Sequence, residues 1–306
     1  MLKNQLSERQ KGIIALFILV IIWGIIPIVP RFLNISFKLF QQVYLRLFLG
    51  FILSLLLFSK KISIKKIITA SKLDLFLIIF RATSYYLLGV VLNTQAILLT
   101  KISNVTLIGA VPITSLLGFI VLREKISFKK IALVCLSFVG ALIVAVNNFS
   151  YFSIGFGELL ALLSSLFISL SLISRKWQTK HLNDQETATL VLLISAAEIF
   201  VASLISNEGL PLHNWSFNTV GFLIAGGILI AGTSYFSNYG LARVDAVLSG
   251  NILMLEPVLA SLFAFLIFKE MPLPKEIIGG LIIILSVVLM HRLEKHYNQN
   301  KKFVIT

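Results

Sequence analysis

The chain has 306 residues, of which 58% are hydrophobic and 13% are charged, and its formal net charge is +14. Soluble proteins carry about a quarter charged residues, so this composition excludes an ordinary soluble domain. Apolar stretches of about 20 residues recur along the whole chain, and each is long enough to cross a bilayer. These stretches are continuous rather than alternating, which excludes a β-barrel and predicts helices.

The first apolar stretch begins near Gly12, is longer than the core of a signal peptide and lacks a small-residue cleavage site, so we interpret it as a membrane span. Short loops separate it from the spans that follow, and they leave no room for a soluble catalytic domain. We expect an all-α polytopic membrane protein with about ten transmembrane helices, at 12–33, 37–58, 73–98, 102–122, 128–146, 155–174, 187–206, 217–241, 245–268 and 273–291.

Basic residues gather on alternate loops of this arrangement. Twenty Lys and Arg residues fall on the side of the two termini, and five fall on the other side. By the positive-inside rule, both termini of this multi-pass protein are expected in the cytoplasm, and the bilayer is expected to be a bacterial inner membrane. The positive charge then reflects topology and contact with anionic lipid, so no nucleic-acid partner is expected.

The two halves of the chain resemble each other. Residues 82–86 (ATSYY) match residues 232–236 (GTSYF), which lie 150 positions later. We therefore expect two five-span repeats, residues 1–147 and residues 148–306, the second ending in a short basic cytoplasmic tail. Because five is an odd number, the second five-span repeat crosses the membrane in the opposite orientation to the first. Inverted repeats are common in secondary transporters that alternate access around a site near the middle of the membrane.

A second pair of matching blocks begins at prolines. Pro112 precedes Arg123-Glu124 much as Pro257 precedes Lys269-Glu270, and each basic-acidic pair opens a turn into the next span. We interpret Pro112, Pro257, Glu124 and Glu270 as structural or gating residues, the two glutamates being ion-paired with their basic neighbours at the membrane interface.

With these features, the chain resembles the EamA-like family of the drug/metabolite transporter superfamily. The matching motifs are the two proline blocks, Trp23-Gly24 with Pro27, Arg46, Arg81, and Gly157-Glu158-Leu159-Leu160-Ala161. The resemblance covers nearly the whole chain and implies a central cavity lined by spans of both halves. It also implies a substrate among amino acids, nucleotide-like metabolites and toxic compounds, moved in either direction.

Charged residues inside spans are costly and are therefore candidates for function. Glu256 lies near the middle of the ninth span beside Pro257, and its repeat counterpart is Val111, which favours a role in handling substrate or protons over a bond to a neighbouring span. Arg81 in the third span, whose counterpart is Ala231, either holds a substrate carboxylate bidentately or extends towards the headgroups.

Arg46 and Glu198 lie at similar depths in the second and seventh spans, which are repeat counterparts. Their opposite charges favour a structural pair. The remaining candidates for the cavity are polar or aromatic: Tyr85 and Tyr235 at equivalent positions of the repeat, then Tyr239, Trp23 and Asn251. Aromatic rings can stack on a substrate or its cation, whereas single Asn residues more often join helices.

The sequence favours a secondary transporter, an exporter or facilitator of small metabolites, with amino acids or related zwitterions first. The alternative is a carrier of a larger cation, such as S-adenosylmethionine or a lipophilic drug. An enzyme is not expected, because no HExxH motif or plausible Ser/His/Asp set is present. No cofactor or metal is expected. The expected partners are a small-molecule substrate, protons where transport is coupled, and the bilayer; monomer and homodimer remain open.

Overall fold

The structure is a computed structural model that describes residues 6–26, 28–100, 105, 108–109, 111–125, 127–145, 155–212, 215–268, 271 and 273–303. Within these ranges, all regular secondary structure is helical. The helices of the first half are α1 (Glu8–Ile25), α2 (Ile28–Leu33), α3 (Leu39–Phe58), η1 (Ser59–Lys61), α4 (Ile64–Ile68), α5 (Lys72–Ala82), η2 (Thr83–Val90), α6 (Val91–Leu99), α8 (Ile113–Ile120) and α9 (Phe128–Ala145).

The described residues of the second half form six α-helices and one short 3₁₀ turn. They are α10 (Phe156–Ser174), η4 (Arg175–Trp177), α11 (Asp184–Ile205), α12 (Phe217–Arg243), α13 (Ala246–Leu253), α14 (Glu256–Phe268) and α15 (Pro274–Phe303). Side-chain caps define several of the starts: Ser7, Ser71, Asn183 and Ser216 each accept a hydrogen bond from a backbone N–H of the first turn.

In the described part of the chain, 7 helical stretches are long and apolar enough to cross a membrane, so the protein is a polytopic α-helical membrane protein. Each of the ten expected spans overlaps at least one described helix, although most of residues 102–112 lie outside the described residues. The count of ten spans therefore stays a prediction.

Two expected spans are discontinuous. The span expected at 12–33 is divided into α1 and α2, and the span expected at 245–268 is divided by a turn at Met254–Leu255 into α13 and α14. The apolar pattern continues through both interruptions, which is why it predicted one uninterrupted helix in each case. Discontinuous spans often line the binding sites of transporters.

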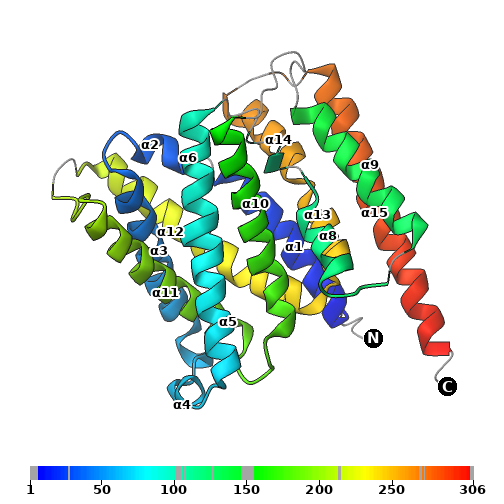
Figure 1. The fold of residues 1–306 in the computed structure, drawn as a ribbon, viewed down its shortest axis with the longest axis horizontal. Coiled ribbons are helices and arrows are strands. Elements are labelled where there is room, and N and C mark those ends of the chain that lie inside the picture. The colour runs from blue at the N-terminus through cyan, green and yellow to red at the C-terminus, as the bar shows by residue number, and fades with distance from the viewer. Residues whose placement is uncertain are drawn as a thin grey trace, which may run out of the picture.

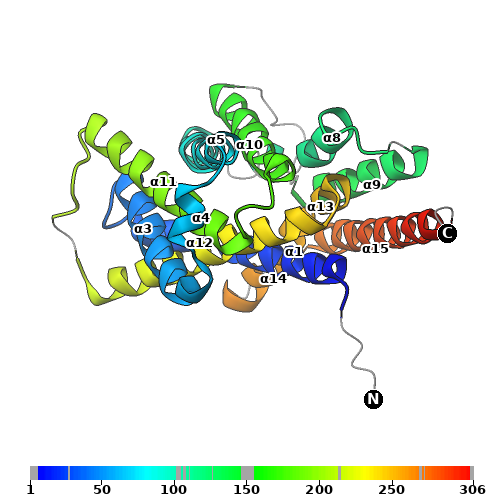
Figure 2. The ribbon, with the colours of Figure 1, turned by 90° about the horizontal axis from the view of Figure 1, so that it is seen from below.

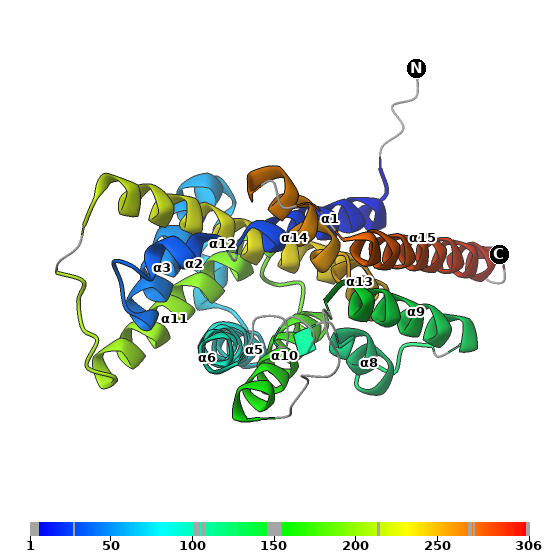
Figure 3. The same cartoon turned by 90° about the horizontal axis from the view of Figure 1, so that it is seen from above.

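The helices lie side by side, with α3 and α11 at one end of the long axis and α9 and α15 at the other (Figures 1 and 2). Three of the five expected spans of the first half pack on their repeat counterparts: α3 on α11, α8 on α13, and α9 on α15. The contacts of α10 with α6 and of α1 with α12 are likewise equivalent under exchange of the halves. Figure 3 shows the same grouping from above. This pairing is the pattern that a two-fold relation between the repeats produces.

The loops separate into two sets at opposite ends of the bundle. One set, here called the basic end, contains residues 59–71 and residues 175–183. Two hydrogen bonds join these loops: Glu186 Oε1 accepts from Ser63 N at 2.9 Å, and Asn183 Nδ2 donates to the carbonyl of Lys61 at 2.8 Å. At the other end, Glu208 Oε2 accepts from Phe40 N at 2.8 Å. Figure 1 shows α4 and α2 at these opposite ends.

A close crossing of α9 and α15 depends on two glycines. A Cβ on Gly279 would lie 2.6 Å from the carbonyl oxygen of Gly140, and a Cβ on Gly140 would lie 2.8 Å from the carbonyl oxygen of Gly279. Small residues permit such close approach of backbones in membranes. Near this crossing, Ser137 Oγ donates a hydrogen bond to Ser286 Oγ at 2.7 Å.

Candidate functional site

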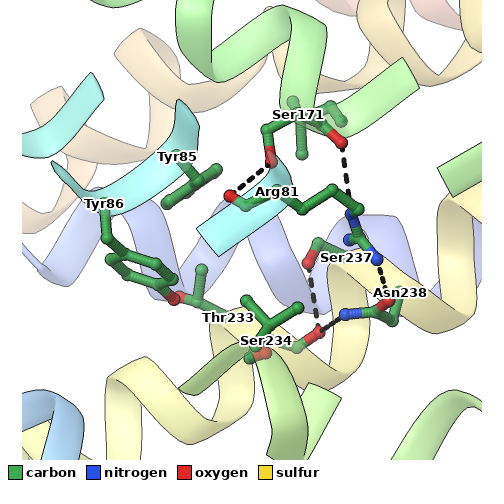
Figure 4. Close-up of a pocket in the computed structure, with 10 residues that line it drawn as sticks. Arg81, Tyr85, Tyr86, Ser171, Thr233, Ser234, Ser237 and Asn238 are labelled. Carbon is green, nitrogen blue, oxygen red and sulfur yellow. Dashed lines mark hydrogen bonds between the residues drawn. The ribbon is translucent and has the colours of Figure 1, made fainter. Parts of the chain in front are cut away.

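A small pocket lies between the third, sixth, seventh and eighth expected spans (Figure 4). It has room for about one water molecule. Its lining consists of one cation, two tyrosines, five residues with hydroxyl or amide groups and two aliphatic residues, namely Arg81, Tyr85, Tyr86, Ser171, Thr233, Ser234, Ser237, Asn238, Leu172 and Val191. Both halves of the chain contribute, so movement of one half against the other would open or close it.

The backbone of the third span changes winding at the pocket. Arg81 lies near the end of α5, and η2, which begins at Thr83, is π-helical. π-Helical turns are rare and occur often at functional sites. Tyr85 and Tyr86 both lie in this segment, and their ring centroids are 4.7 Å apart. The equivalent residues of the second half lie in the regular α-helix α12.

Close packing of α10 holds η2 in place. Ser164 Oγ donates a hydrogen bond to the carbonyl of Gly89 at 2.7 Å, and a Cβ on Gly89 would lie 2.6 Å from Cγ1 of Ile168. About two turns further along α10, Ser171 Oγ donates to the carbonyl of Arg81 at 3.1 Å. The backbone that carries Arg81 is therefore fixed from the second half of the chain.

The Arg81 side chain is 3% exposed and binds only neutral oxygens among the described residues. Its Nη1 donates to Oδ1 of Asn238 at 2.6 Å and to Oε1 of Gln178 at 3.4 Å, while its Nε donates to the carbonyl of Ser171 at 3.3 Å. None of the described ion pairs includes Arg81. A buried cation without an anion is costly, and a bound anion would lower that cost.

Thr233 adds an unused hydrogen-bonding group to the same pocket. Its side chain is 2% exposed, and its Oγ1 is buried without a hydrogen-bond partner among the described residues. In Figure 4 the hydroxyl end of Tyr86 points towards it. Buried polar atoms without partners are uncommon, so this hydroxyl is available to a ligand or a water molecule in the pocket.

Glu256 begins α14, directly after the turn that divides the ninth expected span. Among the described residues, no side chain binds its carboxylate. It is close enough to Tyr85 to act on it electrostatically, although it does not line the Arg81 pocket. The N-terminus of a helix stabilises negative charge, and Pro257 occupies an early position of α14, where its missing N–H leaves no bond unmade.

Trp23 packs against the same hydrophobic core as Tyr85. The other two candidate tyrosines lie elsewhere. Tyr235 packs against Phe58, with ring centroids 4.9 Å apart, and the ring of Tyr239 lies 3.6 Å from the guanidinium carbon of Arg243. The repeat therefore places Tyr85 in the pocket and its counterpart outside it.

Of three further candidates, Asn251 and Glu198 bond to other helices, whereas Arg46 bonds within its own helix. Asn251 is 1% exposed and donates from Nδ2 to Ser137 Oγ at 2.6 Å, which joins α13 to α9. Glu198 accepts a hydrogen bond from Thr83 Oγ1 at 2.7 Å, whereas Arg46 donates from Nε to the carbonyl of Gln42 at 3.0 Å. Arg46 and Glu198, which we interpreted as a pair, are therefore not bonded to each other.

The proline-block residues behave differently from one another. Pro112 caps the start of α8. Glu124 accepts hydrogen bonds from the first two backbone N–H groups of α13, those of Ala246 at 2.6 Å and Val247 at 3.0 Å. Burial raises the pKa of Glu124, and these two bonds offset the effect only in part. We expected an ion pair with Arg123, but this glutamate instead fixes one half of the chain to the discontinuous span of the other. Glu270 lies outside the described residues.

A charged network at the basic end is not predicted by the sequence. Asp184 accepts hydrogen bonds from Arg175 Nη2 and Arg243 Nη1, both at 2.7 Å, and Arg243 Nε also donates to Glu8 at 2.8 Å. Lys11 completes the chain of charges at 2.7 Å from Glu8. The network joins the ends of α1, α10, α11 and α12. The contacts of Arg243 with Glu8 and Asp184 join residues 235 and 59 positions apart, so spacing in the sequence does not reveal the network.

Comparison with known proteins gives three results. The model of the EamA-like transporter family matches residues 10–146 and again residues 155–292. The "Uncharacterized transporter YoaV" of Bacillus subtilis (strain 168) is 28% identical over 135 residues, which cover 44% of this chain and 46% of YoaV, so the match spans about half of that relative. A solved crystal structure with 14% identity covers 94% of this chain and 98% of its own with a TM-score of 0.79, so the two share a fold.

The family match extends over nearly the whole chain and over both halves, which agrees with the pairing of the spans described above. The chain belongs to the EamA-like transporter family, as two repeats of its characteristic unit.

Proposed function

We propose that this transporter carries small zwitterionic metabolites, amino acids first, by alternating access across the bacterial inner membrane, with the basic end in the cytoplasm. The observation that carries the proposal is the state of Arg81. It is buried at the junction of the two halves, its described partners are neutral, and it lines a pocket that also holds the unpaired Thr233 hydroxyl.

A substrate carboxylate suits this arrangement chemically. A guanidinium offers two parallel N–H groups to a carboxylate, and such charge-assisted pairs are stronger than bonds between neutral groups. In Arg81, Nη2 makes no bond among the described contacts, so it is available for this pairing. Asn238, which also donates to the carbonyl of Ser234 at 2.7 Å, holds Nη1 from the opposite side and orients the fork.

Glu256 suits the amino group of the same substrate, or a proton that takes its place. An unpaired carboxylate within the bundle is costly when charged, so it favours binding a cation or a proton. Its field reaches Tyr85, a residue that lines the Arg81 pocket. The opposite charges of Arg81 and Glu256 match the opposite charges of an amino acid.

The pocket has to open for transport, because its present space is far smaller than an amino acid. Both ends of the bundle offer bonds that can break for this purpose. At the basic end, Asp184 and Arg243 join α11 to α12. Near the other end, Ser36 and Thr219 make a hydroxyl contact of 3.1 Å between the first and second halves.

Proteoliposomes containing the purified protein test the proposal. We expect uptake of a ¹⁴C-labelled mixture of the twenty amino acids above that of empty vesicles, and we expect competition by unlabelled amino acids but not by their amides, which lack the carboxylate. Uptake equal to that of vesicles containing the Arg81→Gln variant would remove the amino-acid proposal.

A second candidate function, transport of a larger cation, is supported by the aromatic residues beside Glu256. The Tyr85 and Tyr86 rings adjoin each other, and Trp23 packs against the core that includes Tyr85. Aromatic faces and a carboxylate favour an organic cation. A thermal-stability screen separates the two candidates. Stabilisation by S-adenosylmethionine or lipophilic cations, dependent on Glu256 and independent of Arg81, would favour this second function.

A further inference from the structure

A second buried arginine resembles Arg81 in its lack of an anionic partner. Arg46 of α3 is 5% exposed, and its described hydrogen bond is the one from Nε to the carbonyl of Gln42. None of the described ion pairs includes it.

The second half of the chain makes room for this side chain. A Cβ on Gly226 of α12 would lie 2.6 Å from Cδ of Arg46 and 2.9 Å from its Cγ. The stem of Arg46 thus lies directly on the backbone of α12, where a larger residue would displace it. Arg46 therefore occupies a junction between the two halves, as Arg81 does.

Tyr86 connects the two arginines. Both Arg46 and Arg81 act electrostatically on this buried tyrosine, which lines the Arg81 pocket. At 1.5 Å per residue, Arg81 lies about 14 Å from the start of α5 at the basic end, and Arg46 lies about 10 Å from the start of α3 at the other end. In a hydrocarbon core about 30 Å thick, the two cations are then at different depths, about 6 Å apart along the membrane normal.

We propose that Arg46 is a second anion-binding position on the transport path, which receives the substrate carboxylate between Arg81 and the end of the bundle opposite the basic end. The proposal rests on the function proposed above and adds a route to it. A carboxylate that leaves Arg81 passes Tyr86 and meets a second guanidinium before it reaches water, so it is never left without a cation inside the bundle.

A structural ion pair of Arg46 would require a carboxylate partner, and none of the described ion pairs provides one. Glu198 accepts a hydrogen bond from Thr83 on Oε1, and its Oε2 is buried without a partner among the described residues, so it is not bonded to Arg46. Two buried cations without described anions at one junction indicate a substrate that brings negative charge, in agreement with a carboxylate and not with a simple cation.

The test uses three variants in proteoliposomes with the ¹⁴C amino-acid mixture. Arg46→Gln removes the charge and Arg46→Lys retains it. Gly226→Ala displaces the side chain without changing any charge, and Gly221→Ala on the same helix is its control, because a Cβ there meets nothing within 4 Å. We expect at least about a tenfold loss of uptake in Arg46→Gln and Gly226→Ala, partial recovery in Arg46→Lys, and wild-type uptake in Gly221→Ala.

A binding measurement separates this proposal from a structural role. The measurement is thermal stabilisation of the protein by the unlabelled amino-acid mixture. We expect Arg46→Gln to bind amino acids within about threefold of the wild-type affinity, because Arg81 remains. The variant would then bind substrate normally but transport it poorly. Loss of stabilisation and transport together, with Arg46→Lys no better than Arg46→Gln, would overturn the second position. Wild-type protein that neither binds nor transports amino acids would instead overturn the proposed function itself.

Discussion

The Arg81→Gln variant tests whether Arg81 binds substrate or only supports the fold. The variant loses the 2.6 Å hydrogen bond to Asn238, and bonds to charged groups contribute about 1.5–3 kcal/mol. It also removes a buried charge that has no described anionic partner, and the burial of such a charge costs several kcal/mol. Because these two effects oppose each other, we expect a midpoint of thermal unfolding within about 5 °C of wild type.

Substrate binding responds much more strongly to the same change. Truncating one partner of a buried charge pair costs about 2–5 kcal/mol, which corresponds to a dissociation constant about 30-fold to several thousand-fold higher. An amino acid present at about 100 times its dissociation constant stabilises the folded protein by about 2.7 kcal/mol, and a 30-fold weaker affinity reduces this to about 0.9 kcal/mol. Ligand stabilisation should therefore fall by at least two thirds in the variant.

The assay is thermal unfolding of detergent-purified protein with and without the amino-acid mixture, followed by uptake in proteoliposomes. Arg292→Gln is the matched control, because Arg292 is exposed and the change in charge is the same. A large loss of stability without ligand, or unchanged ligand stabilisation, would refute the reasoning, since the first indicates a structural residue and the second a residue outside the site.

Three further predictions concern the carboxylates and the helix crossing. Glu256→Gln should flatten the pH dependence of uptake, and an unchanged pH profile in a variant that still transports would remove this carboxylate from proton coupling. Gly279→Ala should lower the melting temperature by roughly 2–12 °C relative to Gly221→Ala, because the new Cβ would meet a backbone oxygen at 2.6 Å; equal melting temperatures would contradict this. The hydrogen bonds of Glu8 with Lys11 and Arg243 lower its pKa from 4.5 to about 2. The stabilisation by ionised Glu8 is then complete above pH 4.5 and should disappear as the pH falls to about 2, which is measured as convergence of the melting temperatures of wild type and Glu8→Gln.

Most of the fold was accessible from hydrophobicity, charge and self-similarity. Continuous apolar stretches predict helices because lipid offers no partners to the backbone, so the assignment does not depend on weak local preferences. The interruptions within the helices could not be predicted in this way. The turn at Met254–Leu255 and the π-helical winding that begins at Thr83 both lie within long stretches that are hydrophobic on average, so hydrophobicity alone predicted uninterrupted helices there.

The site was accessible only in part. Arg81 and Tyr85 were found because a charge or ring in a span has to be explained, and both line the pocket. Tyr86 and Ser171 were missed, because a Tyr in an aromatic run and a Ser in an apolar helix are common. Tyr235 was expected in the cavity by symmetry with Tyr85, but the two halves have different windings at these positions.

The last prediction concerns two charged residues that are not shared by the two repeats. The pairing of the spans lines the pocket with residues of both halves. A residue that occurs at equivalent positions in both halves cannot distinguish the two ends of a substrate. Arg81 stands where the other half has Ala231, and Glu256 stands where it has Val111. Changing Arg81 to Ala and Glu256 to Val together would make these positions symmetric. Since the pocket-side charges are costly to bury and the helix pairing is unaffected, we expect a folded protein with at least wild-type thermal stability and no amino-acid uptake. A variant that fails to fold would show that these charges hold the repeats together, and the substrate would then have to be sought elsewhere in the bundle.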